Sequence, residues 1–435
     1  MVLLLILTTA CSSQINAPEE NSHTESESSK AVSSAAEDSD EEEKSDVAEI
    51  LIGTSNFKYD NRILKYAQHL DENYNVELRT LSEDPTERET ELYRLRLEIM
   101  SGGGPDAFIL PTNEPGVFMN DGVTPREQLF MDVERQMYAG IFLPLDDLIA
   151  ESEYYDVNAH YEAIMDAGKT EEGQVVLPLL FSYNVFILDK SQLKQPDMQL
   201  ESWEEVVGCG DDKLMSFLRG RMIRWYGAQY DRFIDYKNEE LLLTEEAIAT
   251  DMHAFSDVQP LTTDESSTFE IAMRKTMDEF ALAEYASCPD SAIVLPLPNT
   301  SGGLTAYITA YAAINRNSEY AEDAFRFIEL MLSDEVQSDI GIREDSMGIT
   351  YSYGNGCRPS TTLLGSVSGV ATGKNAYSEE ENAFLAGLVD RTSAVRFCSD
   401  IDTVLLNAAR SSCNGEDPDE IAARVYDEMK MIIAE

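Results

Sequence analysis

The order of apolar and polar residues predicts alternating strands and helices from residue 47 onward. Residues 47–57, VAEILIGTSNF, begin with an apolar run and end in small polar residues, which is typical of a buried strand that runs into a loop. Apolar residues then recur at helical spacing over 61–74, and residues 75–81 have the pattern of a second strand. The folded part of the chain is therefore predicted to begin in the order β-α-β.

The next predicted helix and strand, at residues 88–100 and 106–110, lie on either side of three glycines. Gly102, Gly104 and Ala107 fit the spacing G-x-G-x-x-[GA], the fingerprint of dinucleotide-binding loops. That fingerprint needs its glycines after a strand and before a helix, so that the N–H groups of the helix face the pyrophosphate. Here the helix comes first. We therefore predict that the glycines end the helix and turn the chain into the strand.

The same alternation continues to the end of the chain. The pattern predicts helices over 140–152, 158–168, 321–337 and 417–435, a capped helix start at 202–207, strands over 174–181 and 183–189, a strand-loop-strand unit over 291–315, and a mostly helical stretch over 209–287. The fold class expected from this order is α/β.

Length and charge narrow the classes of partner. A chain of 435 residues, 43% of them hydrophobic, is long enough for two cores of ordinary size. The 81 acidic and 32 basic residues give a formal net charge of −49, which repels nucleic acids and anionic lipid headgroups. We expect no nucleic-acid partner, and an acidic surface of this kind favours solubility.

The N-terminus, MVLLLILTTAC, resembles a bacterial lipoprotein signal peptide that ends at a lipidated Cys11. Two features depart from that pattern: Leu7 stands four residues before the cysteine rather than three, and no Lys or Arg precedes the apolar run. Residues 1–11 are predicted to be the signal peptide, with a true start upstream or an unprocessed apolar terminus as alternatives. Residues 12–46 are rich in Ser, Glu, Asp and Ala, and are predicted to form a disordered acidic tether.

The remaining cysteines argue against a metal site. They are five in number, with no C-x-x-C pair and no histidine at the spacing of metal ligands: Cys209, Cys288, Cys357, Cys398 and Cys413. We predict no bound metal. One disulfide, for example between Cys398 and Cys413, stays open because spacing alone does not establish it.

Several motifs, taken in order, resemble the extracellular solute-binding lipoproteins of ABC importers, of the maltodextrin-binding type. The motifs are EIMSGGGPDAFIL at 98–110, GQVVLPLLFSYNVFILDKSQL at 173–193, SWEEVV at 202–207, AYAAINRNSEYAEDAFRFIELMLSDEVQ at 310–337 and NGEDPDEIAARVYDEMKMIIAE at 414–435. The resemblance spans nearly all of residues 47–435 and is poorest between 209 and 290.

The resemblance implies a periplasmic-binding-protein-like fold of type II, with two lobes that each contain a mixed sheet flanked by helices. The lobes would comprise residues 47–180 plus 306–345 and residues 181–305 plus 346–435, with crossovers close to Phe181 and between Pro296 and Tyr311. Closure would be a hinge motion that a solute stabilises by contacting both lobes.

Candidate ligand residues follow the predicted strands, because solutes in open α/β sheets bind beyond the carboxyl ends of strands. They are Ser55, Asn56, Phe57, Tyr59, Pro111, Thr112, Asn113, Phe181, Ser182, Tyr183 and Tyr307, with Trp225 as an aromatic platform in the second lobe. Hydroxyls, amides and aromatic rings together suit a neutral sugar. The alternatives are turn roles for Asn56 and Asn113 and core roles for Phe57, Phe181 and Trp225, while Asp106 is predicted to be structural.

The resemblance thus implies a monomeric, lipid-anchored protein on the extracellular face of the membrane. It would deliver a mono- or oligosaccharide to ABC permease subunits, although polyamines, peptides and lipid-derived solutes stay open. We expect no cofactor and no catalytic residues. The sequence AGKT at 167–170 resembles the end of a phosphate-binding P-loop, but the motif also needs a glycine at position 163, where Ala163 stands. A secreted carbohydrate-active hydrolase and a surface adhesin are the alternative functions.

Overall fold

The computed structural model divides into two compact units, Met1–Ser45 and Asp46–Glu435. The structure describes residues 47–52, 74–82, 84–112, 128–152, 155–272, 291–333, 342–344, 350–352, 355–356 and 379–434, all of them in the second unit. The predicted signal peptide with Cys11, the tether and the helix predicted over 61–74 lie outside these residues. Within them, no helix has the length and apolar character needed to cross a membrane.

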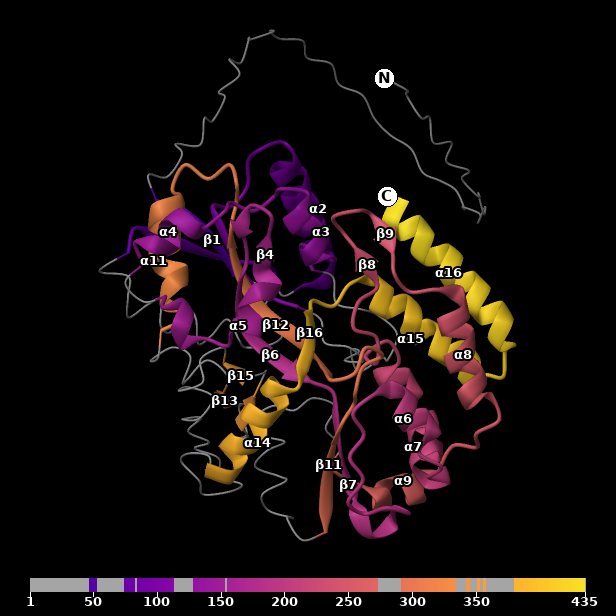
Figure 1. The fold of residues 1–435 in the computed structure, drawn as a ribbon. Helices are drawn as coiled ribbons and strands as arrows, with labels where there is room; N and C mark the ends of the chain where they lie inside the picture. The colour runs from indigo at the N-terminus through magenta and orange to yellow at the C-terminus, as the bar shows by residue number, and fades with distance from the viewer. Residues whose placement is uncertain are drawn as a thin grey trace, which may run out of the picture. The chain divides into compact units, whose positions relative to one another are not determined.

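Seven strands of the described residues form a mixed sheet in the order β15-β6-β12-β3-β1-β2, with β16 beside β12 (Figure 1). Its strands are β1 (Ala48–Ile52), β2 (Val76–Thr80), β3 (Ala107–Pro111), β6 (Leu177–Tyr183), β12 (Leu304–Ile314), β15 (Asn355–Gly356) and β16 (Thr392–Arg396). β1 pairs in parallel with β2 and β3, while β12 is antiparallel to both β3 and β6. The strands predicted at the start of the chain are confirmed.

The glycines after helix α2 (Pro85–Met100) end that helix, as predicted. Asp84 caps the first turn through two backbone N–H groups. At the other end, Gly102 and Gly104 have φ values of 87° and 89°, which residues with a side chain rarely adopt. A Cβ on Gly104 would lie 2.9 Å from the Cγ1 atom of Ile99. The glycines therefore serve a tight helix stop that feeds β3.

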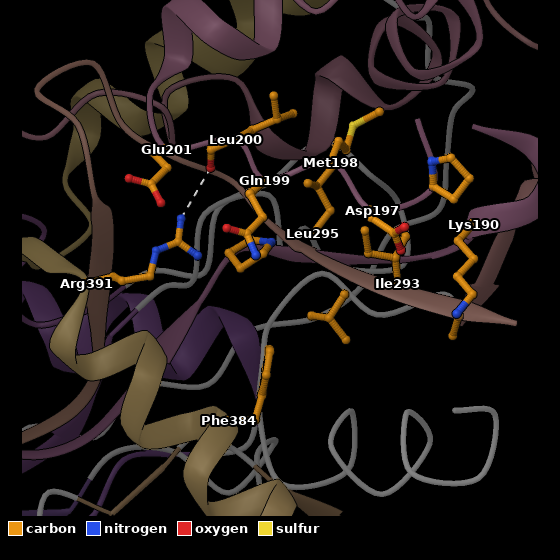
Figure 2. A pocket seen from close by; sticks show the side chains of 14 residues that line it. Lys190, Asp197, Met198, Gln199, Leu200, Glu201, Ile293, Leu295, Phe384 and Arg391 are labelled. Atoms are coloured by element: carbon orange, nitrogen blue, oxygen red, sulfur yellow. Dashed lines mark hydrogen bonds between the residues drawn. The ribbon is translucent and has the colours of Figure 1, made fainter. Parts of the chain in front are cut away.

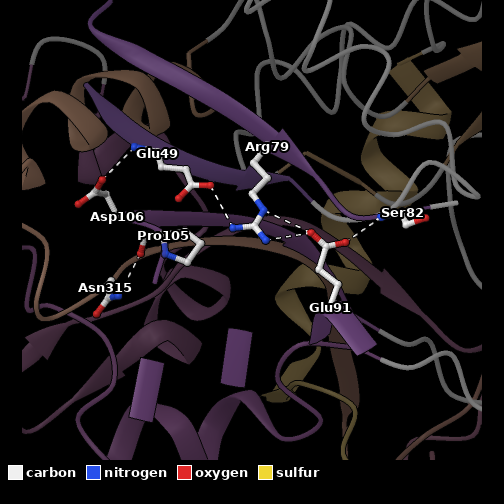
Figure 3. A network of polar contacts seen from close by, with 7 residues as sticks. All are labelled: Glu49, Arg79, Ser82, Glu91, Pro105, Asp106 and Asn315. Atoms are coloured by element: carbon white, nitrogen blue, oxygen red, sulfur yellow. Dashed lines mark hydrogen bonds and ion pairs between the residues drawn. The ribbon is translucent and has the colours of Figure 1, made fainter. Parts of the chain in front are cut away.

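Asp106 fixes the entry to β3, which agrees with its predicted structural role (Figure 3). Its carboxylate accepts a hydrogen bond from the Glu49 backbone N–H at 2.9 Å and one from the Ser318 hydroxyl at 2.7 Å. The side-chain amide of Asn315 donates to the Pro105 carbonyl at 3.0 Å. These contacts tie the turn to β1 and to the end of β12.

Two helix predictions in the first half of the chain are wrong in part. Over 140–152, only α4 (Asp146–Ala150) is helical, because the Leu143 N–H donates to the Ile314 carbonyl and Phe142 forms a bridge with Asn315 at the end of β12. Over 158–168, α5 is a single turn between two 3-10 turns. Those elements are η2 (Val157–Ala159), α5 (Glu162–Met165) and η3 (Asp166–Gly168).

A second sheet has the order β10-β7-β11 and joins helices from both halves of the chain (Figure 1). The strands are β7 (Val185–Asp189), β10 (Glu270–Ala272) and β11 (Ala292–Pro296), and the helices are α6 (Trp203–Gly208), α7 (Asp212–Trp225), α8 (Glu245–Ser256), α9 (Thr263–Phe269), α15 (Asp400–Cys413) and α16 (Pro418–Ala434). Most of their buried apolar side chains form a core separate from that of the larger sheet, to which Val185, Ile187 and Ala292 of the smaller sheet belong. We call the core of the larger sheet the first core and the core around the smaller sheet the second core.

Some of the remaining described elements have no counterpart in the sequence pattern. The elements are α3 (Val133–Tyr138), α14 (Glu379–Asp390), η4 (Lys190–Gln192) and the two-stranded pairs β4 (Lys169–Thr170) with β5 (Gly173–Gln174), β8 (Ile234–Asp235) with β9 (Glu240–Leu241), and β13 (Ile342–Glu344) with β14 (Thr350–Ser352). The helix predicted over 321–337 is observed as α11 (Ala321–Leu330). The hairpin β8–β9 lies in the stretch predicted to be mostly helical. The sequence pattern also predicts none of α14, β16 and α15.

The predicted second lobe differs from the observed packing at β16. Residues 346–435 are predicted to belong to that lobe, but β16 pairs with β12 in the larger sheet. The lobe boundaries stay a prediction. Cys398 and Cys413, considered as a disulfide pair, are both free thiols.

Candidate functional site

The two cores meet where the chain passes from one sheet to the other. β6 ends at Tyr183 in the larger sheet, and β7 begins at Val185 in the smaller sheet, so Asn184 alone separates them. The return passage runs from β11 to β12, where Tyr307 packs in the second core while its neighbours Ala306 and Ile308 pack in the first. We call the region around these two passages the junction.

The junction contains the carboxyl ends of two strands of the larger sheet. The Thr112 N–H donates to the Thr309 carbonyl at 2.9 Å, and its hydroxyl donates to the carbonyl of Ile308. On the other side of β12, Phe181 pairs with Ile308. The structure therefore brings the predicted site residues Thr112 and Phe181 to the same point of β12.

The two faces of β6 differ near its carboxyl end, where one is apolar and the other polar. Phe181 and Tyr183 point into the first core, where their rings pack edge to face with centroids 5.7 Å apart. Burial raises the pKa of the Tyr183 hydroxyl, which lies 2.6 Å from the Thr392 hydroxyl. These positions favour the core role, which is the alternative considered for Phe181.

Ser182 and Asn184 occupy the opposite face, because side chains alternate along an extended chain. Ser182 is fully buried and Asn184 is 6% exposed. Within the described part of the chain, neither the Ser182 hydroxyl nor the Asn184 Nδ2 atom has a hydrogen-bond partner. Buried polar groups are nearly always paired with protein, water or ligand, so this face presents two hydrogen-bonding groups whose partners are not among the described residues.

Tyr307 is held by a buried arginine. Its hydroxyl donates to the Ala228 carbonyl at 3.0 Å and accepts from the Arg396 guanidinium at 3.3 Å. The guanidinium lies between the rings of Phe233 and Tyr307, 4.1 and 4.8 Å from their centroids. Burial opposes the charge of Arg396, but the ion pair with Asp402 outweighs it and raises the pKa of Arg396. Tyr307 is 1% exposed and packs in the second core.

Acidic groups of helix α3 face the same group of charges. Burial raises the pKa of Glu134 to about 8, and the negative charge of Asp132 adds to the effect. Arg232 and Arg396 oppose it, which places Glu134 within electrostatic reach of both arginines. The raised pKa favours the protonated form of Glu134, in which a carboxyl group can both donate and accept hydrogen bonds.

Trp225, the predicted aromatic platform, lies inside the second core. It is 1% exposed, its indole N–H donates to the Leu218 carbonyl at 3.0 Å, and its ring packs against Trp203 and Phe255. This position favours the core role. Five other predicted site residues lie outside the described residues: Ser55, Asn56, Phe57, Tyr59 and Asn113.

A hollow lies beside the edge strand β11, away from the junction residues Ser182 and Asn184 (Figure 2). It has a volume of about 480 Å³ and is bordered by residues 196–201, by β11 and by Phe384 of α14. Arg391 closes one side, where its guanidinium donates to the Leu200 carbonyl at 3.2 Å. Its lining is mixed in charge, and none of the sequence-predicted site residues borders it. In the parts of the chain that are described, no cluster of His, Cys, Asp and Glu suits a metal ion.

Sequence reasoning missed Asn184, Arg396, Asp132 and Glu134. Asn184 carried a signal, because it stands two residues after Ser182 in an extended apolar stretch and so shares its face. The other three had no such signal, since α3 and β16 are far apart in sequence and only the tertiary fold brings their residues together.

Comparison with known proteins agrees on the fold. No family model and no curated protein matches the sequence. A family 1 extracellular solute-binding protein from Alicyclobacillus acidocaldarius is 13% identical with a TM-score of 0.55, and the match covers 89% of this chain and 98% of that one. An ABC substrate-binding protein from Listeria monocytogenes in complex with cycloalternan is 12% identical with a TM-score of 0.52, over 89% and 98% of the two chains.

A de novo designed cysteine esterase is similar to the same degree, at 15% identity and a TM-score of 0.54, over 89% and 98% of the two chains. At such identities the likeness concerns the fold alone. The chain therefore has the periplasmic-binding-protein-like α/β fold, with sheets flanked by helices, and the fold implied by the sequence motifs is confirmed.

Proposed function

We propose that this protein is the extracellular solute-binding component of an ABC import system and that it captures a hydroxyl-rich solute, a mono- or oligosaccharide, at the junction of its two cores. The lipid anchor at Cys11 and delivery to permease subunits are part of the proposal. So are the predicted ligand residues of the loops after β1 and β3: Ser55, Asn56, Phe57, Tyr59, Thr112 and Asn113.

One observation carries the proposal. Ser182 and Asn184 present a hydroxyl and an amide that are buried and unpaired within the described residues. An unpaired buried amide or hydroxyl costs roughly 1–3 kcal/mol, which a partner that supplies the missing hydrogen bond recovers. Sugar hydroxyls both donate and accept, so they complement a serine and an asparagine without needing a charge.

The position of these residues supports the same function. They lie at the passage between β6 and β7, beside the carboxyl end of β3, and solutes of open α/β sheets bind at such positions. The similar protein from Listeria monocytogenes was solved with the saccharide cycloalternan. The hydroxyl of Ser182 and the amide of Asn184 are uncharged groups of the kind that bind carbohydrate hydroxyls.

A thermal-shift screen of mono- and oligosaccharides tests the proposal, with chromatography of each incubated sugar. A bound solute raises the melting temperature by mass action, and it stays chemically unchanged if the protein only binds. We expect at least one saccharide to raise the melting temperature by several degrees with no product formed. Hydrolysis of a saccharide would point to a carbohydrate-active enzyme, and a flat response over the whole panel would contradict the proposal.

A further inference from the structure

The hairpin β8–β9 makes three side-chain contacts with elements that precede the junction in sequence. The Tyr236 hydroxyl donates to the Asp132 carboxylate at 2.6 Å. Its ring stacks on that of Tyr138, with centroids 6.3 Å apart and planes 14° apart. Lys237 forms an ion pair with Glu171. Asp132 and Tyr138 border α3, whose Val133 and Met137 pack in the first core.

The base of the same hairpin belongs to the second core. Phe233 and Ile234 are 4% and 5% exposed and pack in that core. The Leu242 N–H donates to the Phe233 carbonyl at 2.7 Å, which fixes the two arms of the hairpin. The hairpin is therefore anchored in the second core and reaches α3 with its side chains.

Asp132 is suited to hold such a contact. One carboxylate oxygen caps α3 by accepting from the Arg135 N–H at 3.1 Å, and the other accepts from Tyr236. Asp132 is only 9% exposed, so water replaces a lost partner poorly. A second link is the Arg135 guanidinium, which donates to the Ile432 carbonyl of α16 at 3.2 Å.

We propose that Asp132 and Tyr236 form a closure contact, which sets the fraction of molecules in which the two cores are held together and thereby the affinity for the solute. The effect on solute affinity rests on the proposed function. A solute that binds both cores gains from every contact that favours the closed arrangement, because its apparent affinity scales with the population of that arrangement. Tyr236 is then a positioning residue that acts on the solute through α3.

Hydrogen exchange of the full chain without any solute tests the contact, with peptides resolved by mass spectrometry. The variant Tyr236→Phe removes only the hydroxyl, and Asp132→Asn keeps a residue that caps helices well. The matched control is Tyr93→Phe, since Tyr93 is 64% exposed on α2. A hydrogen bond to a charged group shifts an opening equilibrium about tenfold or more.

We expect Tyr236→Phe and Asp132→Asn each to speed exchange about tenfold both in α3 and in the hairpin, with no change in the control. Unchanged exchange in α3 would overturn the closure contact, including the case in which the hairpin alone exchanges faster, because that is the mark of a local role. The effect on affinity is measured with the saccharide found by the screen. We expect this saccharide to dissociate several-fold faster from Tyr236→Phe than from the wild type. If no saccharide binds the wild type, the proposed function fails while the exchange result still decides the contact.

Discussion

Asp402 accepts hydrogen bonds from both terminal nitrogens of Arg396, each at 2.8 Å, although the two residues are only 5% and 2% exposed. Arg396 ends β16 in the larger sheet, whereas Asp402 lies in the first turn of α15 in the second core. The pair therefore joins the two cores in a place that water does not reach. Such a pair adds little net stability over apolar residues, but removal of one partner leaves a buried charge uncompensated.

We expect Arg396→Met to lower the free energy of unfolding by about 3–5 kcal/mol, because Asp402 is then buried without a counter-charge. The matched control is Arg424→Met, since Arg424 pairs with Glu416 at 2.9 Å on the surface and should change stability by less than about 1 kcal/mol. Urea denaturation followed by circular dichroism measures both. Equal losses in the two variants would show that burial of the Arg396 pair has no special weight.

Gly104→Ala tests the helix stop. The φ of 89° and the 2.9 Å approach of a Cβ to Ile99 predict a loss of about 1–3 kcal/mol, whereas Gly103 lacks a positive φ and its Cβ would lie 3.6 Å from the nearest atom. Gly103→Ala should therefore stay within about 0.5 kcal/mol of the wild type. Thermal unfolding of both variants is the measurement, and the prediction fails if Gly103→Ala is the more damaging.

Trp225→Phe separates the two roles considered for this residue. We expect a loss of about 1–3 kcal/mol in unfolding free energy, because the smaller ring leaves a cavity and the Leu218 carbonyl loses its donor. Saccharide affinity of the folded protein should stay within about twofold of the wild type. Unchanged stability together with a large loss of affinity would instead place Trp225 in contact with the solute.

Glu134 gives stability a pH dependence with a definite sign. Its pKa of about 8 in the folded protein lies above the ordinary 4.5, so its favourable contribution is complete below about pH 4.5 and is lost as the pH rises through 8. Glu134→Gln removes this loss. Relative to the wild type, the variant should gain about 1–2 kcal/mol between pH 5 and pH 9, a magnitude reduced by the partial exposure of the side chain. Denaturation at the two pH values measures the gain, and a constant difference would rule out the raised pKa.

The fold followed from the sequence where local patterns decide the structure. The run at residues 47–57 predicted β1, and the glycines after the helix at 88–100 predicted the stop that Gly102 and Gly104 provide. The helix predicted over 140–152 is wrong in part because tertiary pairing overrode periodicity. There, Phe142 bridges Asn315, a partner distant in sequence that no local pattern reveals.

The candidate site was predictable only in its loops. The rule that solutes bind beyond the carboxyl ends of strands pointed to Thr112 and Ser182, which lie at the ends of β3 and β6 on the two sides of β12. It also pointed to Phe181, which faces the core, because the rule gives the position of a residue and not the face to which its side chain turns. The charged group of Arg396, Asp402 and Glu134 is assembled by packing between distant segments.

Titration calorimetry of Asn184→Ala measures whether the junction binds the solute. Because the Asn184 amide has no partner for its Nδ2 atom within the described residues, the substitution removes a costly unpaired group and should not destabilise the free protein. If that amide binds a solute hydroxyl, the same substitution should weaken saccharide binding about tenfold. A stable variant with tenfold weaker binding is the predicted result, and a variant that binds the saccharide as tightly as the wild type would contradict solute capture at this junction.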